Sequence, residues 1–375
     1  MQNIDPIWSA VEHHQDDLIA LSDRVWGMPE LLYAEYRSCA EHTAMLREKG
    51  FRITEALAGI PTAVLGEAGK GGPVIAILGE YDALPGLSQR AGIARPQPEE
   101  QGGAGHGCGH NLLGSAALLA ACAIKDWLEK TGTPGRVRYY GCPAEEGGAA
   151  KALMVRDGAF DDVDAAITWH PASMTKVDEA ESLANTRMDF VFTGRASHAA
   201  VAPHLGRSAL DAAELMSSGV NYLREHIPDS SRIHYAYLDA GGTAPNVVQA
   251  RTKVRYAIRS TSLSGMRALN ERVKKVAYGA AMMTETEVDI SIMSAVSNML
   301  GNTPLEEAMQ RAMDELGGVR FDEVDRAYAR EIQATLSAED IEAAYQVVGI
   351  ETQPDEPLCD YVVPMDKRGK AMMGS

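Results

Sequence analysis

The stretch Gly72-Pro73-Val74-Ile75-Ala76-Ile77-Leu78-Gly79 is a continuous apolar run between glycines, which predicts a strand buried on both faces. A helix is predicted at 115–129, and further buried strands at 136–141 and 165–168. Strands that alternate with helices in this way are typical of an α/β fold with a largely parallel sheet. We therefore predict the α/β class, with a mostly parallel sheet in the N-terminal part of the chain.

A second domain is predicted where this pattern changes. The chain has 375 residues, which is long for a single core. From residue 187 onward the order becomes β-α-β-β-α-β, which is typical of a small two-layer α+β sandwich. We predict an inserted α+β domain at 184–295 and a main domain formed by 1–183 and 296–375. The elements of the inserted domain are predicted at 187–192, 208–225, 233–237, 252–259, 263–281 and 287–292.

The composition argues against several classes of partner. The net charge is -17 and the isoelectric point is near 5.0, so the chain repels nucleic acid backbones. No apolar run approaches the length that spans a bilayer, so no membrane partner is expected. The first residues lack the basic and apolar parts of a secretion signal, and five scattered cysteines indicate reduced thiols. We expect a cytoplasmic protein.

Candidate metal ligands follow the predicted strands or precede the predicted helix. Cys108 and His110 lie just before the helix, Glu145 and Glu146 follow the strand at 136–141, and His170 follows the next strand. In open α/β sheets the carboxyl ends of strands meet at one crevice, so these side chains can converge. Thiolate, imidazole and carboxylate bind borderline divalent ions, and a second carboxylate can serve as a base. The sequence therefore predicts a metal-dependent hydrolase.

Simpler interpretations of these residues remain open. A glycine-rich turn with a buried thiol would explain Cys108, adjacent glutamates are commonly solvated, and His170 can be a core residue. His198 lies in the predicted inserted domain, so it is not simply added to the metal ligands. The turn that ends at Asn246 can present an amide to a ligand, although turn chemistry alone also explains it. Residues 91–105 are predicted to form a flexible loop at the site.

Five motifs occur in order along most of the chain: Gly79-Glu80-Tyr81-Asp82-Ala83-Leu84-Pro85, Gly107-Cys108-Gly109-His110-Asn111-Leu112-Leu113-Gly114, Gly141-Cys142-Pro143-Ala144-Glu145-Glu146-Gly147-Gly148, Thr168-Trp169-His170-Pro171 and Ala244-Pro245-Asn246-Val247-Val248. Together they resemble the family of dinuclear metallopeptidases and amidohydrolases that includes carboxypeptidase G, hippurate hydrolases and plant auxin-conjugate hydrolases. Within this family the chain looks most like the aminobenzoyl-glutamate hydrolase group.

The resemblance implies a zinc-peptidase-like catalytic domain that holds two divalent metal ions, with manganese or zinc expected. By position, Cys108 would bridge the ions, and His110, Glu146 and His170 would be the other ligands. Glu145 would be the general base.

The resemblance also assigns residues outside this ligand set. Asp82 would support the ligands. The inserted domain would act as a lid and as the dimerisation domain of a homodimer. Its His198 would stabilise the oxyanion in the other protomer's site, and Asn246 and Arg259 would hold the substrate carboxylate.

The predicted function is hydrolysis of the amide bond of a small N-acyl amino acid such as aminobenzoyl-glutamate. A metal ion would lower the pKa of a bound water, and Glu145 would take its proton as the hydroxide attacks the amide carbon. A dipeptidase for unusual dipeptides and a hydrolytic deaminase of an aromatic amine need the same groups. A non-catalytic binding subunit with an incomplete metal site is a further alternative.

That last alternative arises from a departure from the family pattern. The resemblance implies a final metal-ligating His near the C-terminus, whereas every His of this chain lies at or before residue 234. We therefore expect a chain that is truncated at its C-terminus, with one metal position incompletely liganded.

Overall fold

The computed structural model describes residues 5–348, 350–353, 355–368 and 370–373. The chain divides into two compact units. Unit 1 comprises 1–175, 319–342 and 353–361, and unit 2 comprises 176–318, 343–352 and 362–375. The predicted inserted domain, 184–295, lies within unit 2.

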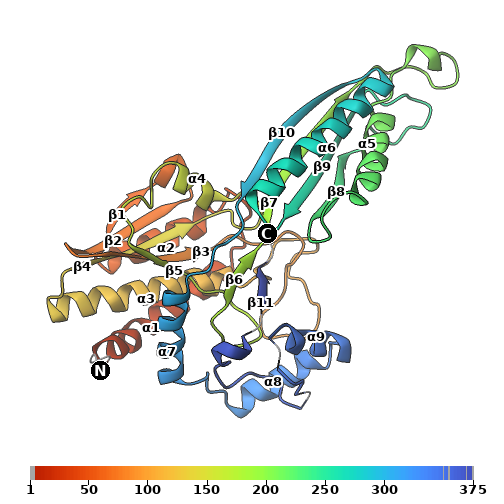
Figure 1. The fold of residues 1–375 in the computed structure, drawn as a ribbon. Helices are drawn as coiled ribbons and strands as arrows, with labels where there is room; N and C mark the ends of the chain where they lie inside the picture. The colour runs from red at the N-terminus through yellow and green to blue at the C-terminus, as the bar shows by residue number, and fades with distance from the viewer. Residues whose placement is uncertain (1–4, 349, 354, 369, 374–375) are drawn as a thin grey trace. The chain divides into compact units, whose positions relative to one another are not determined.

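The centre of unit 1 is a five-stranded sheet in the order β1-β2-β4-β3-β5 (Figure 1). β3 pairs in parallel with β4 and β5, whereas β2 pairs antiparallel with β1 and β4. The α/β class is confirmed, and the expected mostly parallel sheet is corrected to a mixed one, because a short connection through the 3-10 turn η1 reverses the chain between β1 and β2. The strands are β1 (Arg52–Glu55), β2 (Val64–Lys70), β3 (Val74–Glu80), β4 (Gly135–Cys142) and β5 (Ala165–Ile167), and η1 is Leu57–Gly59.

Helices cover both faces of this sheet because its central strands are apolar on both sides. On β4, Val137 and Tyr139 are buried in one core cluster, and Tyr140 and Cys142 are buried in another. The first cluster includes residues of α1 (Asp5–Trp26), α2 (Tyr36–Glu48) and α3 (His110–Thr131), and the second includes residues of α4 (Ala150–Arg156). Unit 1 also contains α8 (Glu323–Gln333), and α9 (Ala338–Val348) begins in it.

The helix α3 positions the start of the candidate site. It is long and apolar enough to cross a membrane by length and composition, with a mean hydropathy of 1.2, so the expectation that no segment reaches that length is wrong. Its apolar window is 56% buried, and Leu118 and Ala121 lie in the core of unit 1, as in the core helix of a globular domain. Gly114 lets it approach β3, because a Cβ there would lie 2.4 Å from the Glu80 carbonyl oxygen.

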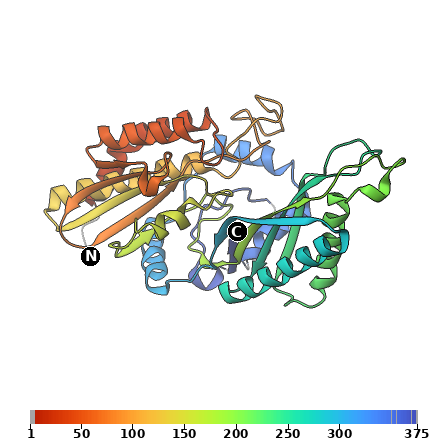
Figure 2. The same ribbon diagram turned by 90° about the horizontal axis from the view of Figure 1, so that it is seen from above.

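Unit 2 contains a four-stranded antiparallel sheet in the order β10-β7-β9-β8. Two helices, α5 and α6, pack against each other and bury Phe190, Phe192 and Tyr256 on one face of the sheet (Figures 1 and 2). The predicted β-α-β-β-α-β order is confirmed. The elements are β7 (Ala184–Thr193), α5 (Ala209–Arg224), β8 (Arg232–Asp239), β9 (Arg251–Ser260), α6 (Leu263–Thr284) and β10 (Glu287–Val296).

The remaining elements of unit 2 are short or peripheral. The strands β6 (Glu179–Ser182) and β11 (Lys370–Met373) pair in parallel as a separate two-stranded sheet. The others are η2 (Pro203–Leu205), α7 (Thr303–Leu316) and η3 (Met365–Lys367).

Candidate metal centre

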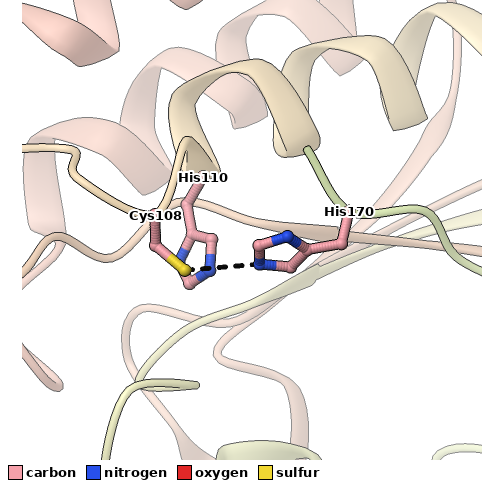
Figure 3. A group of neighbouring side chains, drawn as sticks. All are labelled: Cys108, His110 and His170. Carbon is pink, nitrogen blue, oxygen red and sulfur yellow. Dashed lines mark hydrogen bonds between the residues drawn. The ribbon is translucent and has the colours of Figure 1, made fainter. Parts of the chain in front are cut away.

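Cysteine, histidine and carboxylate side chains meet in unit 1 beside the carboxyl ends of β3, β4 and β5. Cys108 and His110 project from the turn that begins α3, and His170 projects toward them from the segment after β5 (Figure 3). The ligand atoms of these three residues lie within 4.8 Å of one another. A second group with the same spacing consists of Glu80, His110 and Glu145. The buried ring of His110 is therefore shared by both groups.

The orientation of His110 is set by Asp82. The ring Nδ1 lies 3.0 Å from Asp82 Oδ1 and 3.0 Å from the Asp82 carbonyl oxygen. Both partners only accept, so Nδ1 carries a hydrogen and the Nε2 lone pair of the neutral ring is available to a ligand. Burial lowers the pKa of His110, but the hydrogen bonds to Asp82 and Cys108 and the negative charge of Glu80 outweigh it and raise the pKa to about 11, so a metal ion must displace the Nε2 proton in order to bind.

A positive species is needed between His110 and Glu80. His110 Nε2 lies 3.2 Å from Glu80 Oε2, and both side chains are almost wholly buried. Neither atom has a hydrogen-bond partner among the residues that the structure describes. A lone pair and a carboxylate oxygen repel at this distance unless a proton or a metal ion lies between them. The site thus fits a cation.

Asp82 also supports the glutamate pair. Its Oδ2 accepts the backbone N–H of Glu146 at 3.0 Å, and Glu146 Oε1 lies 3.9 Å from His110 Nε2. The carboxylate of Asp82 therefore positions both the ring of His110 and the backbone of Glu146.

The turn that carries Cys108 requires glycine. Gly109 has a φ of 75°, and a Cβ there would lie 2.9 Å from Pro171 Cγ. Beyond this turn, His170 Nδ1 donates to the Pro171 carbonyl at 2.8 Å, which leaves Nε2 to accept. Cys108 Sγ lies 3.3 Å from that Nε2. Thiol and imidazole therefore face each other with their ligand atoms.

Glu145 lies at the bend that follows β4. Ala144, directly before it, has a φ of 53°, so the chain turns sharply after Pro143. Glu145 is exposed on one side, while its neighbours partly remove it from water; this desolvation and the charge of Glu80 raise the pKa of its carboxyl. A raised pKa brings a carboxylate closer to the range of a general base at neutral pH.

Sequence reasoning missed two residues of this site, Glu80 and Lys151. The ammonium of Lys151 on α4 donates to Glu80 Oε1, on the other side of the carboxylate from His110. The sequence did contain a signal for Glu80. It is the last residue of β3, and residues two apart along a strand point to the same side, so Glu80 lies on the same side as Asp82. No local pattern indicates Lys151, which lies 71 residues away in sequence.

The other predicted residues lie in unit 2. Ala199 N donates to the Asn246 carbonyl at 2.9 Å, which places His198 and Asn246 on neighbouring segments. Arg259 lies on β9, where burial and the positive charge of Arg187 lower its pKa. Their roles toward the centre in unit 1 stay predictions.

The family of the chain follows from a comparison with known proteins. The model of peptidase family M20/M25/M40 matches residues 76–356, which include the whole candidate centre. The chain belongs to this family. Membership of the M20/M25/M40 family places it among hydrolases of amide bonds.

Two relatives illustrate the range of the family. The chain is 47% identical over 331 residues to one subunit of the p-aminobenzoyl-glutamate hydrolase of Escherichia coli (strain K12), and the match covers 88% of this chain and 69% of the relative. It is 31% identical over 292 residues to the Xaa-Arg dipeptidase of Mus musculus, which covers 75% of this chain and 63% of that protein. The chain thus spans about two thirds of the length of both relatives.

Solved structures share the fold. An aminobenzoyl-glutamate utilization protein from Klebsiella pneumoniae has a TM-score of 0.65 at 19% identity, covering 89% of this chain and 91% of that one. A dinuclear metal-binding peptidase of Bacillus subtilis has a TM-score of 0.56 at 21% identity, with 81% of each chain covered. These likenesses show the shared fold. The candidate ligand groups of this chain combine sulfur, nitrogen and oxygen donors, which suits divalent metal ions.

Proposed function

We propose that this chain hydrolyses the amide bond of an N-acyl amino acid, and that aminobenzoyl-glutamate is its type of substrate. The observation that carries the proposal is the convergence of Cys108, His110 and His170 beside the carboxylate of Glu145. The 47% identity to one of the chains of an aminobenzoyl-glutamate hydrolase supports the substrate class.

In this proposal Cys108, His110, Glu146 and His170 would hold two divalent ions, manganese or zinc. The set of sulfur, nitrogen and oxygen donors suits such borderline ions. When bound, the ions acidify a water molecule and polarise the amide carbonyl. Asp82 keeps the lone pair of His110 directed at the site, and Lys151 neutralises part of the charge of Glu80.

The proton steps fall to Glu145. Its carboxylate takes one proton from the attacking water as the C–O bond forms, and gives it to the amide nitrogen as the C–N bond breaks. The products are a carboxylic acid and an amine, and Glu145 returns to its starting state. The raised pKa of Glu145 suits both steps.

In this proposal His198, Asn246 and Arg259 contact the substrate, and His198 acts in the site of an associated chain. His198 Nδ1 accepts the backbone N–H of Ala200 at 3.2 Å, so the neutral ring carries its hydrogen on Nε2 and can donate to an oxyanion. Asn246 and Arg259 offer an amide and a guanidinium for a substrate carboxylate.

We also propose that the chain associates with a second, related polypeptide. Two relatives are named as different subunits of one Escherichia coli hydrolase, and this chain is 47% and 29% identical to them. The homodimer expected from the resemblance is the competing outcome. Light scattering after gel filtration measures the mass of the assembly. The chain is purified alone and after co-expression with a second chain that resembles the 29% identical subunit. A dimer of the chain alone would support the homodimer, and a stable complex of the two chains would support the proposal.

The experiment that tests the function follows p-aminobenzoate release from p-aminobenzoyl-glutamate by the manganese- or zinc-loaded chain. Glu145→Gln should lower kcat by about 100-fold or more, because the base is lost, while metal content is kept. The control Glu129→Gln removes an exposed carboxylate of α3 and should retain activity.

Each other outcome contradicts part of the proposal. Full activity of Glu145→Gln would remove Glu145 as the base. Hydrolysis of a dipeptide that ends in arginine, without release of p-aminobenzoate, would favour the dipeptidase alternative. Metal binding and substrate affinity without turnover would identify a non-catalytic binding protein.

A further inference from the structure

The loop between α1 and α2 contacts two of the segments that carry residues of the candidate centre. The Glu30 carbonyl oxygen accepts the N–H of Ala83, directly after Asp82, at 2.8 Å. The Tyr33 hydroxyl donates to the Gly148 carbonyl at 2.7 Å, two residues beyond Glu146. The loop from Glu30 to Glu35 therefore contacts both the segment that follows Asp82 and the segment that follows Glu146.

Glu35 makes the contact nearest to the glutamate pair. Its Oε1 accepts the N–H of Ala144, the residue directly before Glu145, at 2.9 Å, and the N–H of Tyr33 at 3.0 Å. Glu35 is fully buried, and burial raises the pKa of its carboxyl. Taking a carboxylate out of water is costly unless hydrogen bonds or opposite charges compensate for the lost hydration.

Capping of α2 does not explain Glu35. It occupies the N-cap position of this helix, where a side chain would ordinarily accept the helix's own first amides, but it makes no such bond. Glu30 serves these amides instead: its carboxylate accepts from the backbone N–H of Arg37 and Ser38 at 3.2 and 2.9 Å. The Glu35 side chain is therefore left for Ala144.

The segment that Glu35 holds needs an external support. Ala144 adopts a φ of 53°, a left-handed conformation that residues with a Cβ rarely adopt. At its other end, a Cβ on Gly148 would lie 2.5 Å from the Tyr33 ring, so the segment and the loop are in close contact. A strained bend persists only where surrounding contacts fix it.

We propose that Glu35 is a positioning residue: through Ala144 it fixes the bend that directs Glu145 and Glu146 into the site, and Tyr33 fixes the far end of the same segment. Glu35 belongs to neither candidate ligand group, so its role is to hold other residues in place. Its effect on catalysis rests on the proposed function, but its effect on the segment does not.

The test uses the full chain and hydrogen exchange of the Ala144 amide. Glu35→Ala should speed this exchange by about tenfold or more, since one bond to a charged acceptor is lost. Glu35→Gln keeps an oxygen that can accept from Ala144 and should restore protection. The metal-free chain serves for this measurement.

Two controls separate positioning from general loosening. Glu41→Gln removes the carboxylate that pairs with Arg24 on the surface of α2, and should leave Ala144 exchange unchanged. Glu30→Gln weakens the start of α2 and should also leave it unchanged. Equal acceleration in Glu30→Gln and Glu35→Ala would overturn the inference.

Kinetics give the second readout. In Glu35→Ala, kcat should fall by about tenfold with KM within about twofold, because the substrate contacts are intact while Glu145 and Glu146, which act on the reaction, are misplaced. Glu35→Gln should recover most of the loss. If Glu35→Ala does not fold, Tyr33→Phe removes one exposed hydroxyl and should still lower kcat by about threefold.

The outcomes distinguish this inference from the proposed function. If Glu35→Ala speeds Ala144 exchange but the chain hydrolyses no amide, the proposed function is wrong and the positioning contact stands. An active chain in which Glu35→Ala, or Tyr33→Phe where only that variant folds, changes neither exchange nor kcat would sink the inference and keep the function.

Discussion

The carboxylate of Asp82 determines which nitrogen of His110 faces the candidate metal centre. Asp82 Oδ1 lies 3.0 Å from His110 Nδ1, so the lone pair of Nε2 is the one turned toward Glu80. The other oxygen of Asp82 accepts the N–H of Glu146. A single side chain thus sets the direction of a ring and the path of the backbone beside it.

Removal of the Asp82 carboxylate should weaken the binding of metal ions. Asp82→Ala frees the ring of His110 to rotate, and we expect a loss of about 10- to 100-fold in affinity for Zn²⁺ or Mn²⁺. Isothermal titration of the metal-free chain measures it. Asp157→Asn, which alters an exposed pair with Arg156, is the matched control. A change in affinity of less than threefold in Asp82→Ala, which is on the order of 0.6 kcal/mol, would contradict this role.

Lys151 should stabilise the fold through Glu80. Lys151→Met leaves a buried carboxylate without its ammonium, and we expect the free energy of unfolding to fall by about 2 kcal/mol. In the double variant with Glu80→Gln, the charge is gone and most of the loss should be recovered. Urea unfolding of the metal-free chain gives both values; additive losses in the double variant would exclude the coupling.

His42 predicts how stability depends on pH. Burial, and then the charge of Arg24, lower its pKa to about 3, and its Nδ1 accepts the Tyr139 hydroxyl at 2.9 Å. The unfolded chain therefore binds more protons below pH 6.5, and stability falls as the pH drops from 6.5 toward 3, by up to about 1.4 kcal/mol per unit from this residue. His42→Gln should show a shallower slope in this window. An unchanged slope would mean that His42 is protonated in the folded chain.

Gly114 should be sensitive to a single methyl group. In Gly114→Ala the new Cβ would meet the Glu80 carbonyl oxygen at 2.4 Å, and we expect a loss of about 1–3 kcal/mol in stability. Gly279→Ala is the matched control on α6, where nothing lies within 4 Å of a Cβ, and it should stabilise by about 0.5–1 kcal/mol. Thermal unfolding compares the two variants; similar shifts would contradict the close approach of α3 to β3.

The pattern of apolar residues predicted the long elements, and the strands that are buried on both faces, correctly. The strand at 72–79 and the helix at 115–129 correspond to β3 and α3, and the elements of 184–295 appear in the predicted order. The strands β1 and β2 were missed because β1 is short and β2 contains two glycines, Gly66 and Gly69. Their antiparallel pairing makes the sheet mixed.

The candidate site was predictable where a ligand type stood beside a strand end. Cys108, His110 and His170 came from this rule, and the structure brings them together. Which glutamate binds metal and which is the base stays a prediction. Lys151 and Glu35 could not be found this way, because their partners lie 71 and 109 residues away in sequence and no local spacing records such contacts.

The hydrogen bond from Ala144 to Glu35 has a consequence for the order of assembly. It joins residues 109 positions apart, and the bond from Tyr33 to Gly148 joins residues 115 apart. During synthesis the N-terminal part of a chain emerges first, so α1 and α2 exist before the bend after β4 is made. The loop that supports the bend is therefore complete before the bend is made, so the bend folds onto a partner that is already present in the chain.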